Sequence, residues 1–232
     1  EAFIGDMAIK NNWSIPKANG ETKLNKKIAV IGGGPSGLTC AAFLAKQGYQ
    51  VTIYEKHNEL GGILAHGIPE FRLDKAIVLE VIKKILDLGI EVKVNTCLSV
   101  EKKENSITIQ ELENKYDAIF LSFGANISSK MGIEGEELSG VYGGNELLEK
   151  GIHPDYTEKN VAIIGGGNVA MDTARTIKKL GAKTVTVIYR RAEEQMPAEK
   201  KEIAEAKEEG VEFLFQTNIL KILGNKQVEK IE

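Results

Sequence analysis

The chain has 232 residues, of which 42% are hydrophobic and 27% are charged, and its formal net charge at pH 7 is −3. This length can bury the cores of one or two domains, and the lack of a basic excess argues against nucleic acid as a partner. No apolar run approaches the roughly 20 residues of a membrane span, and the N-terminus lacks the charged and apolar regions of a signal peptide. We therefore expect a cytoplasmic protein that does not contact a membrane.

We expect residues 1–24, which contain Trp13 and Pro16, to be the tail of an upstream helical region. A first domain is expected over residues 25–150 and a second over residues 151–232. Because the sequence starts at Glu1 and stops after an expected strand, a fragment or a processed piece of a longer protein is one interpretation of it.

The first domain opens with a short β-branched run, 28–31, that leads straight into three glycines and an alanine-containing helical stretch. The helix is expected to end at Gly48, because a left-handed cap favours glycine, and a second strand is expected at 51–54. This order of strand, tight turn, helix and strand predicts a parallel βαβ crossover.

The turn of this crossover fits the dinucleotide-binding pattern G-x-G-x-x-G at Gly32, Gly34 and Gly37, with Pro35 and Ser36 in between. The first glycine permits the tight turn, the second lets the backbone approach a pyrophosphate, and the third lets the helix pack closely on the sheet. The pyrophosphate would then meet the helix N-terminus, where free N–H groups favour negative charge.

Glu55 ends the second strand, where a carboxylate accepts hydrogen bonds from ribose hydroxyls and repels a 2′-phosphate. The first turn therefore predicts a ligand with an unphosphorylated ribose, FAD or NAD. FAD is favoured by Gly62, in a glycine pair that a bulky flavin nucleotide could approach, and by Gly124, at the carboxyl edge of the expected sheet. Lys56, beside the acid, and Arg72 are added to the cofactor-binding candidates.

Beyond the first crossover, apolar residues at helical spacing predict a helix over 73–88 that stops at Gly89. Short strands separated by polar turns are expected at 90–94, 107–110 and 118–123.

The pattern of the first turn then returns, because "KKIAVIGGGPSG" at 26–37 is repeated as "KNVAIIGGGNVA" at 159–170. A strand is expected at 161–164, a helix that ends at Gly181, and a second strand at 185–189. The sequence therefore predicts an α/β fold with two tandem Rossmann-like dinucleotide-binding units, on the plan of glutathione reductase.

In the second turn, Gly165, Gly167 and Ala170 fill the three positions of the pattern, with Asn168 and Val169 between them. An alanine at the third position remains within the recognised fingerprint, although its methyl group pushes helix and strand slightly apart.

The two copies differ most at the end of the second strand, where Tyr189 aligns with Glu55 and is followed by Arg190 and Arg191. Guanidinium groups bind phosphate with charge-assisted, often bidentate hydrogen bonds, so this strand end predicts a 2′-phosphate, as in NADPH. The alternative is a solvated turn in which both arginines pair with neighbouring glutamates at 193 or 194.

The stretch 193–209 is rich in Glu and Lys at helical spacing and predicts a helix with a solvated face. A last strand is expected at 211–215.

Cys40 and Cys97 lie far apart in the sequence and form neither a CxxC redox pair nor a metal-ligand cluster, so we interpret both as small core residues and expect no metal site. For His66 we favour a structural or solvent-facing role over direct chemistry, since hydride transfer needs no general base. His57 and His153 are interpreted as surface residues.

Five stretches occur in order along the chain: "IGDMAIKNNW", "GGGPSGLTCAAFLAKQGYQVTIYEK", "GGILAHGIPEFRL", "IGGGNVAMDTARTIKKLGA" and "VIYRRAEEQMPAEKKE". Together they resemble the family of the small (beta) subunit of NADPH-dependent glutamate synthase over nearly the whole chain. Relatives in that family include the flavin- and NADP-binding portion of dihydropyrimidine dehydrogenase and subunits of ferredoxin:NADP oxidoreductases.

The resemblance implies that electrons pass from NADPH to FAD and onward through iron–sulfur clusters to a partner, such as a large catalytic subunit. It implies FAD contacts at Gly32, Gly34, Gly37, Glu55 and Gly62, and NADPH contacts at Gly165, Gly167, Asn168, Arg190 and Arg191.

This sequence also departs from the family pattern. The cysteine-rich, cluster-binding region that precedes this N-terminus in the family is not present, and family members continue past residue 232 to complete the NADP domain and cover the flavin. Gln195 stands where the family usually has Glu.

The favoured function is therefore an NADPH-oxidising flavoprotein that serves as an electron-input subunit. The alternatives are a related ferredoxin:NADP oxidoreductase subunit and a nucleotide-binding module without turnover of its own. A disulfide reductase of the thioredoxin-reductase kind would need the CxxC pair that Cys40 and Cys97 do not supply.

Overall fold

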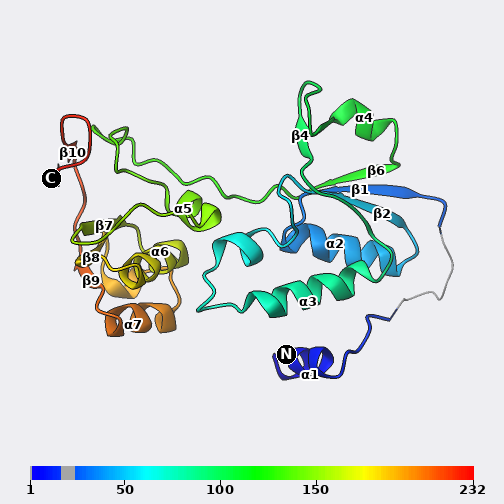
Figure 1. Cartoon of the computed structure of the whole chain (residues 1–232), viewed down its shortest axis with the longest axis horizontal. Helices are drawn as coiled ribbons and strands as arrows, with labels where there is room; N and C mark the ends of the chain where they lie inside the picture. The colour runs from blue at the N-terminus through cyan, green and yellow to red at the C-terminus, as the bar shows by residue number, and fades with distance from the viewer. Residues whose placement is uncertain (1, 17–23) are drawn as a thin grey trace. The chain divides into compact units, whose positions relative to one another are not determined.

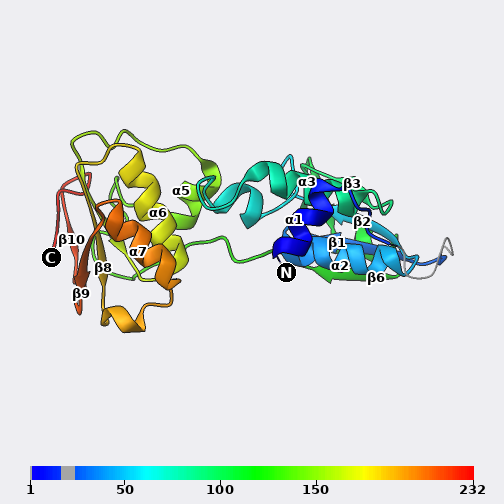
Figure 2. The ribbon, with the colours of Figure 1, turned by 90° about the horizontal axis from the view of Figure 1, so that it is seen from below.

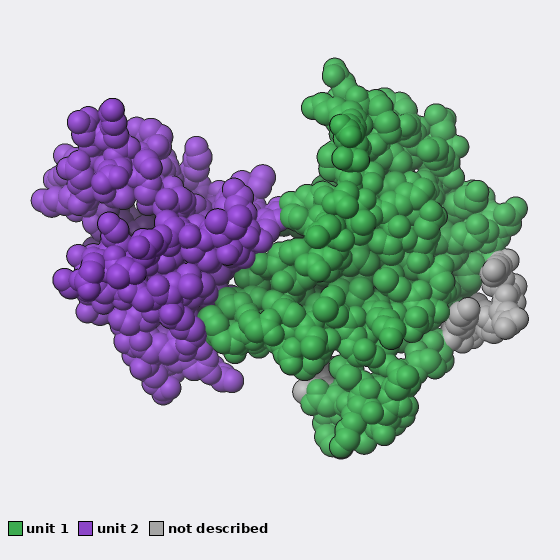
Figure 3. Space-filling model, in the orientation of Figure 1, with its two compact units in different colours: residues 1–125 green, residues 126–232 purple. Residues whose placement is uncertain are grey.

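The computed structural model describes residues 2–16 and 24–232, which belong to two compact units, residues 1–125 and 126–232 (Figure 3). Residue 1 and residues 17–23 of the expected N-terminal tail lie outside the described residues. The second unit begins before the expected boundary at residue 151, because helix α5 (Gly144–Lys150) packs on helix α6 (Asn168–Lys179).

The first unit is built on a parallel sheet with the strand order β3-β2-β1-β6 (Figure 1). Its elements are α1 (Ala2–Lys10), β1 (Lys27–Ile31), α2 (Pro35–Lys46), β2 (Gln50–Tyr54), the π-helical turn η1 (Ile63–Gly67), α3 (Lys75–Leu86), β3 (Glu91–Lys93), β4 (Cys97–Ser99), β5 (Ser106–Thr108), α4 (Ile109–Glu113) and β6 (Ala118–Leu121). Strands β4 and β5 form a separate parallel pair. The expected βαβ crossover is confirmed.

Both faces of this sheet are covered, and neighbouring residues of one strand serve opposite faces. Val30 and Ile53 are fully buried in a cluster with residues of α2 and α3, whereas Ile31 packs with Leu112 of α4. Figure 1 shows α2 and α3 on one side of the sheet and α4 on the other. Burial of both faces explains why the central strand β1 is apolar without alternation from Ile28 to Ile31.

The helices of the first unit begin and end where the sequence signals them. Helix α3 starts after Asp74, whose side chain accepts a hydrogen bond from the Ala76 N–H at 2.7 Å. Gly48 and Gly89, which follow α2 and α3, have φ values of +92° and +89°, as left-handed caps require.

The strand expected at 107–110 is wrong in its second half, because helix α4 begins at Ile109. Thr108 and Glu111 form a reciprocal capping box: the Thr108 hydroxyl accepts from the Glu111 N–H at 3.2 Å, and the Glu111 carboxylate accepts from the Thr108 N–H at 2.9 Å. These local hydrogen bonds start a helix within an apolar run that alone resembles a strand.

The second unit contains a parallel sheet, β7-β8-β9, and an antiparallel pair, β10-β11. After α5 its elements are β7 (Asn160–Ile164), α6, β8 (Thr184–Tyr189), the 3-10 turn η2 (Glu193–Gln195), α7 (Lys200–Glu208), β9 (Glu212–Phe215), β10 (Ile222–Leu223) and β11 (Lys230–Ile231). Helices α6 and α7 lie side by side along the sheet (Figure 2). The order β7-α6-β8-α7-β9 therefore repeats β1-α2-β2-α3-β3 of the first unit.

The single helix expected over 193–209 is wrong, because the chain is extended at Met196, directly before Pro197, and α7 starts only at Lys200. A residue before proline avoids the helical region. The face expected to be solvated is also partly buried, since three glutamates of this segment surround the buried Arg175 guanidinium: Glu202 at 2.5 Å, Glu205 at 2.8 Å and Glu209 at 2.8 Å.

The predicted α/β class with parallel sheets is confirmed. Among the described residues, none of the helices has the length and apolar character needed to traverse a bilayer.

Candidate functional site

The first glycine turn, residues 32–37, joins β1 to α2 and is packed too tightly for side chains. Gly32 has φ +102°, and a Cβ atom there would lie 2.2 Å from the Ser122 carbonyl oxygen. A Cβ on Gly37 would lie 1.9 Å from the Gly32 carbonyl oxygen. Glycine is therefore required at both positions, one for the turn and one for the close approach of helix to strand.

Glu55 lies buried beside this turn and is hydrogen-bonded to it. The Gly33 N–H donates to Oε2 at 2.7 Å, and the His57 N–H donates to Oε1 at 2.9 Å. Each carboxylate oxygen can accept a further hydrogen bond, so the acid is held in place and keeps acceptor capacity for a ligand.

After β2 the chain returns to the glycine turn. The Gly61 N–H donates to the Gly33 carbonyl at 2.8 Å, and Gly62, with φ +52°, passes so close that a Cβ atom there would lie 2.9 Å from Gly34 Cα. The turn η1 that follows is tied to α3, because the Lys75 ammonium donates to the carbonyls of Leu64, at 2.7 Å, and of Ile68. The sequence-predicted Gly34 and Gly62 therefore form one backbone surface.

The remaining residues of the first unit that the sequence predicts to bind the cofactor lie on several different elements. Pro35 and Ser36 are exposed at the start of α2. Lys56 is exposed after Glu55, and Arg72 is half-buried in the turn before α3. Gly124 follows β6 with φ +74°, and no atom lies within 4 Å of the Cβ position there.

The second glycine turn, residues 165–170, joins β7 to α6 in the same way. Gly165 has φ +134°, and a Cβ atom there would lie 3.7 Å from the Ala170 Cβ, an ordinary contact distance. No atom lies within 4 Å of the Cβ position of Gly167, so the backbone is open to a close approach there. Val169 is half-buried, and the Asn168 side-chain oxygen accepts a hydrogen bond from the Glu199 N–H at 2.9 Å.

The strand registers make Glu55 and Tyr189 structural equivalents, as the aligned repeat predicts. Ile31 pairs with Tyr54 in the first sheet, and Ile164 pairs with Ile188 in the second, so the next residues along are Glu55 and Tyr189. The tyrosine ring lies over Gly166, where a Cβ atom would be 2.6 Å from Cε2. The position of the acid is thus taken by a neutral ring.

Arg190 and Arg191 follow this ring and are both exposed. Within residues 2–16 and 24–232, neither guanidinium forms an ion pair, and Glu193 instead pairs with Lys207 at 2.6 Å. The alternative of an arginine–Glu193 pair is therefore not adopted, and both positive charges are available to a ligand.

Both turns leave a helix N-terminus without a capping side chain. The N-cap residues are Gly34 for α2 and Gly167 for α6, and neither helix has a side-chain hydrogen bond at its cap. Uncapped N–H groups and the helix dipole favour an anion, such as a phosphate, at each position.

Residues 26–232 match the family described as pyridine nucleotide-disulphide oxidoreductase. The chain belongs to this family.

Relatives of this chain include named subunits of larger proteins. The glutamate synthase [NADPH] small chain of Escherichia coli (strain K12) is 36% identical over 247 residues, covering 100% of this chain and 51% of that protein. The NADPH-Fe(3+) oxidoreductase subunit beta of Geobacter sulfurreducens is 37% identical, covering 94% of this chain and 33% of that protein. The resemblance to the glutamate synthase small subunit is confirmed, and the chain spans about half the length of the small chains it matches, 51% and 50%.

Solved structures show the same fold at low identity. FprA of Mycobacterium tuberculosis in complex with NADPH matches with a TM-score of 0.76 and 19% identity, over 89% of this chain and 63% of that chain. The thioredoxin reductase of T. acidophilum matches with a TM-score of 0.62 and 18% identity, over 89% of this chain and 70% of that chain.

Sequence reasoning missed Ser122, which directly follows β6 and contacts the first glycine turn. Its hydroxyl lies 2.8 Å from the Ile31 carbonyl and 3.0 Å from the Gly32 carbonyl, within hydrogen-bonding distance of both. The only signal in the sequence was its place at the end of an apolar strand, two residues before Gly124.

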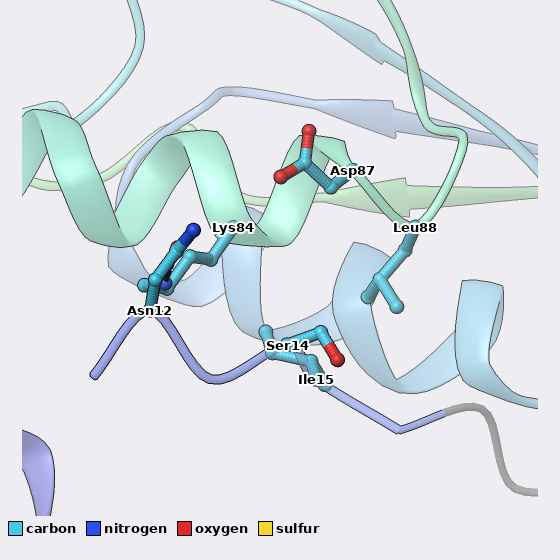
Figure 4. Close-up of a pocket in the computed structure, with 6 residues that line it drawn as sticks. All are labelled: Asn12, Ser14, Ile15, Lys84, Asp87 and Leu88. Atoms are coloured by element: carbon cyan, nitrogen blue, oxygen red, sulfur yellow. Dashed lines mark hydrogen bonds between the residues drawn. The ribbon is translucent and has the colours of Figure 1, made fainter. Parts of the chain in front are cut away.

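A cavity of about 360 Å³ lies between the N-terminal segment and α3, and no residue of a glycine turn lines it (Figure 4). It is lined by Asn12, Ser14, Ile15, Lys84, Asp87 and Leu88. The Lys84 ammonium donates to the Asn12 side-chain oxygen at 2.8 Å and to the Trp13 carbonyl at 3.2 Å. These hydrogen bonds hold the N-terminal segment on the helix, so we interpret the cavity as a packing feature of the first unit.

The two cysteines are free and lie on different elements. Cys40 on α2 is half-buried, and burial raises the pKa of its thiol. Cys97 is exposed, and its interpretation as a core residue is wrong, because β4 belongs to the strand pair outside the main sheet. In the described part of the chain, no three His, Cys, Asp or Glu side chains are grouped as metal ligands.

Proposed function

We propose that the two units are tandem Rossmann-like dinucleotide-binding domains, the first for FAD and the second for NADPH, in an electron-input subunit that oxidises NADPH. The main observation in support of this proposal is that the two units carry opposite charges at the equivalent strand end. The first copy ends its second strand with the buried acid Glu55, and the second copy ends it with Tyr189 followed by two exposed arginines.

In the first unit, the residues present fit an FAD molecule. The adjoining backbones of Gly34 and Gly62, which carry no side chains, and the uncapped start of α2 at Pro35 and Ser36 suit the pyrophosphate. Glu55 has acceptor capacity left for the ribose hydroxyls. Lys56, Arg72 and Gly124 are proposed as further contacts, with Gly32 and Gly37 shaping the turn.

In the second unit, the residues present fit NADPH. Gly165 and Gly167, with Asn168, Val169 and Ala170 at the start of α6, suit the pyrophosphate. Arg190 and Arg191 would hold the 2′-phosphate, and the neutral Tyr189 removes the carboxylate that would repel it.

With both nucleotides bound, the first unit would hold a flavin that can accept a hydride and release electrons singly, and the second unit would hold the hydride donor, NADPH. The protein holds the two nucleotides and selects the phosphorylated one. Names of relatives as small or beta subunits support a large catalytic subunit or an iron–sulfur partner as the destination of the electrons. Cytoplasmic location is part of the same proposal.

The test is a binding experiment on the full chain with three nucleotides: FAD, NADP⁺ and NAD⁺. FAD should bind with a change in flavin absorption and fluorescence, and NADP⁺ should bind more tightly than NAD⁺ in calorimetry. FAD and NADP⁺ should also bind together without competition. Competition between FAD and NADP⁺ for one site would contradict the assignment of one nucleotide to each unit.

A nucleotide-binding module without turnover is the second candidate, because the chain spans about half of its small-chain relatives. Addition of NADPH and an artificial electron acceptor to the FAD-loaded chain separates the two. Steady NADPH oxidation supports the enzyme, and binding without oxidation supports the module.

A further inference from the structure

His66 lies on the turn η1, four residues after Gly62, and its ring is held on two sides. The ring stacks on His57 with the centroids 4.7 Å apart and the planes tilted by 39°. Its Nδ1 atom lies 3.6 Å from Glu59 Oε1, and only 15% of the side chain is exposed. The imidazole therefore has a defined place next to the first glycine turn.

The other ring nitrogen of His66 has no hydrogen-bond partner in the part of the chain that the structure describes. Nε2 is buried, and no hydrogen-bonding atom of the described residues lies within reach of it. Buried polar atoms in folded proteins are nearly always paired, because an unpaired one loses its hydrogen bonds to water without replacement. Such an atom beside a binding surface is therefore a candidate contact for a bound molecule.

The backbones of His66 and of its ring partner are hydrogen-bonded to residues of the proposed flavin-nucleotide site. The His66 N–H donates to the Gly62 carbonyl at 2.9 Å, and Gly62 itself lies against Gly34. The stacking partner, His57, donates its backbone N–H to the Glu55 carboxylate at 2.9 Å. The ring is thus linked to both the pyrophosphate turn and the ribose acid.

We propose that His66 is a cofactor-binding residue whose Nε2 forms a hydrogen bond with the flavin nucleotide of the first unit. This inference rests on the proposed function and goes beyond the structural role expected from the sequence. Nδ1 faces the Glu59 carboxylate, and in the tautomer that carries its proton on Nδ1 the Nε2 atom is a hydrogen-bond acceptor. The group that meets it is then a donor, a hydroxyl or an N–H of the nucleotide.

The experiment compares FAD affinity in the full chain with that of two His66 variants. His66→Phe keeps an aromatic ring on His57 but removes both nitrogens, and His66→Gln restores a polar atom near the place of Nε2. We expect the phenylalanine variant to bind FAD about 3- to 10-fold more weakly and the glutamine variant to recover part of this loss. His153→Phe, a change in the second unit, is the matched control and should leave FAD affinity unchanged. Thermal unfolding of each variant without FAD reports any loss of folding.

A second measurement detects the contact directly. The chain has three histidines, so a ¹⁵N spectrum of histidine-labelled protein contains three imidazoles, and the His66→Phe spectrum assigns one of them. FAD should shift the Nε2 resonance of His66 and leave that of His153 in place. An unmoved Nε2 resonance, or unchanged FAD affinity of a folded His66→Phe variant, would overturn the inference while the proposed function stands. If the unaltered chain binds no FAD at all, the proposed function fails, and this inference fails with it.

Discussion

The Gly33 N–H donates a hydrogen bond to the Glu55 carboxylate at 2.7 Å, which ties the end of β2 to the first glycine turn. The same carboxylate is the proposed partner of the FAD ribose. Replacement of Glu55 by Ala should lower the FAD binding free energy by about 1.5 to 3 kcal/mol, because charge-assisted hydrogen bonds to the ribose are lost. Titration of the variant with FAD, followed by flavin fluorescence, measures this change.

Two further variants distinguish the two roles of Glu55, the proposed contact with the FAD ribose and the hydrogen bond that supports the glycine turn. Glu55→Gln keeps one acceptor oxygen for the Gly33 N–H and should bind FAD with intermediate affinity. Glu113→Ala, which removes an exposed glutamate of the same unit, should bind FAD as the unaltered chain does. Unchanged flavin content in Glu55→Ala would reject the role of this acid.

The second unit should lose its preference for the phosphorylated nucleotide when Arg190 and Arg191 are both changed to Ala. Each charge-assisted contact with a 2′-phosphate is expected to contribute about 10- to 100-fold in affinity. Calorimetry should show weaker NADP⁺ binding and nearly unchanged NAD⁺ binding. Lys200→Ala, an exposed charge removed at the start of α7, serves as the control. Equal losses for the two nucleotides would mean that the arginines support folding.

The two glycine turns should respond differently to a methyl group at their third position. A Cβ on Gly37 would lie 1.9 Å from the Gly32 carbonyl oxygen, so Gly37→Ala should cost about 1 to 3 kcal/mol of unfolding free energy or prevent folding. The second turn already holds a methyl group at this position, and Ala170→Gly should cost only about 0.5 to 1 kcal/mol through helix propensity. Urea unfolding compares the two variants, and equal effects would contradict the difference in packing.

Arg175 should be a main determinant of the stability of the second unit. Its guanidinium is buried and pairs with three glutamates, so Arg175→Met removes the positive charge beside the buried Glu202 and should cost about 3 to 5 kcal/mol. Lys201 pairs with one of the same acids, Glu205, but its side chain is 82% exposed. Lys201→Met should therefore change stability by less than about 1 kcal/mol. Denaturant titration of both variants tests this contrast.

The same cluster should make stability depend on acid pH. The hydrogen bond from Arg175, followed by that from Lys179, lowers the pKa of Glu209 below its ordinary value of 4.5. Its contribution is complete above pH 4.5 and is lost as the pH falls from there through the lowered value, because the unfolded chain takes up the proton first. Melting temperatures between pH 7 and pH 3 should fall less steeply for Glu209→Gln, which starts from a lower stability. Parallel curves would show that another carboxylate dominates.

The elements that sequence predicted well are those determined by neighbouring residues. A β-branched run, three glycines and a helix-forming stretch give strand, turn and helix within about 20 residues, and both copies formed as expected. The exchange of Glu55 for Tyr189 and the arginines was also visible, because strand ends can be aligned from the repeat. The errors at 107–110 and 193–209 arose where a capping box at Thr108 and the extended residue before Pro197 outweighed the periodicity.

The tertiary structure decided what depends on segments far apart in the chain. Because β6 pairs with β1, Ser122 contacts Gly32. Because α7 packs on α6, charged residues of α7 surround Arg175. The segment η1 returns to the first glycine turn, and this places the His66 ring against the His57 ring. Sequence alone determined the local turns, their glycines and the charge at each strand end, because those follow from backbone sterics and hydrogen bonds between near neighbours. The sequence alone could not determine the contacts between distant segments. The free energy that brings such segments together comes from the apolar surface that the whole unit buries, and this must outweigh the entropy cost of closing each loop.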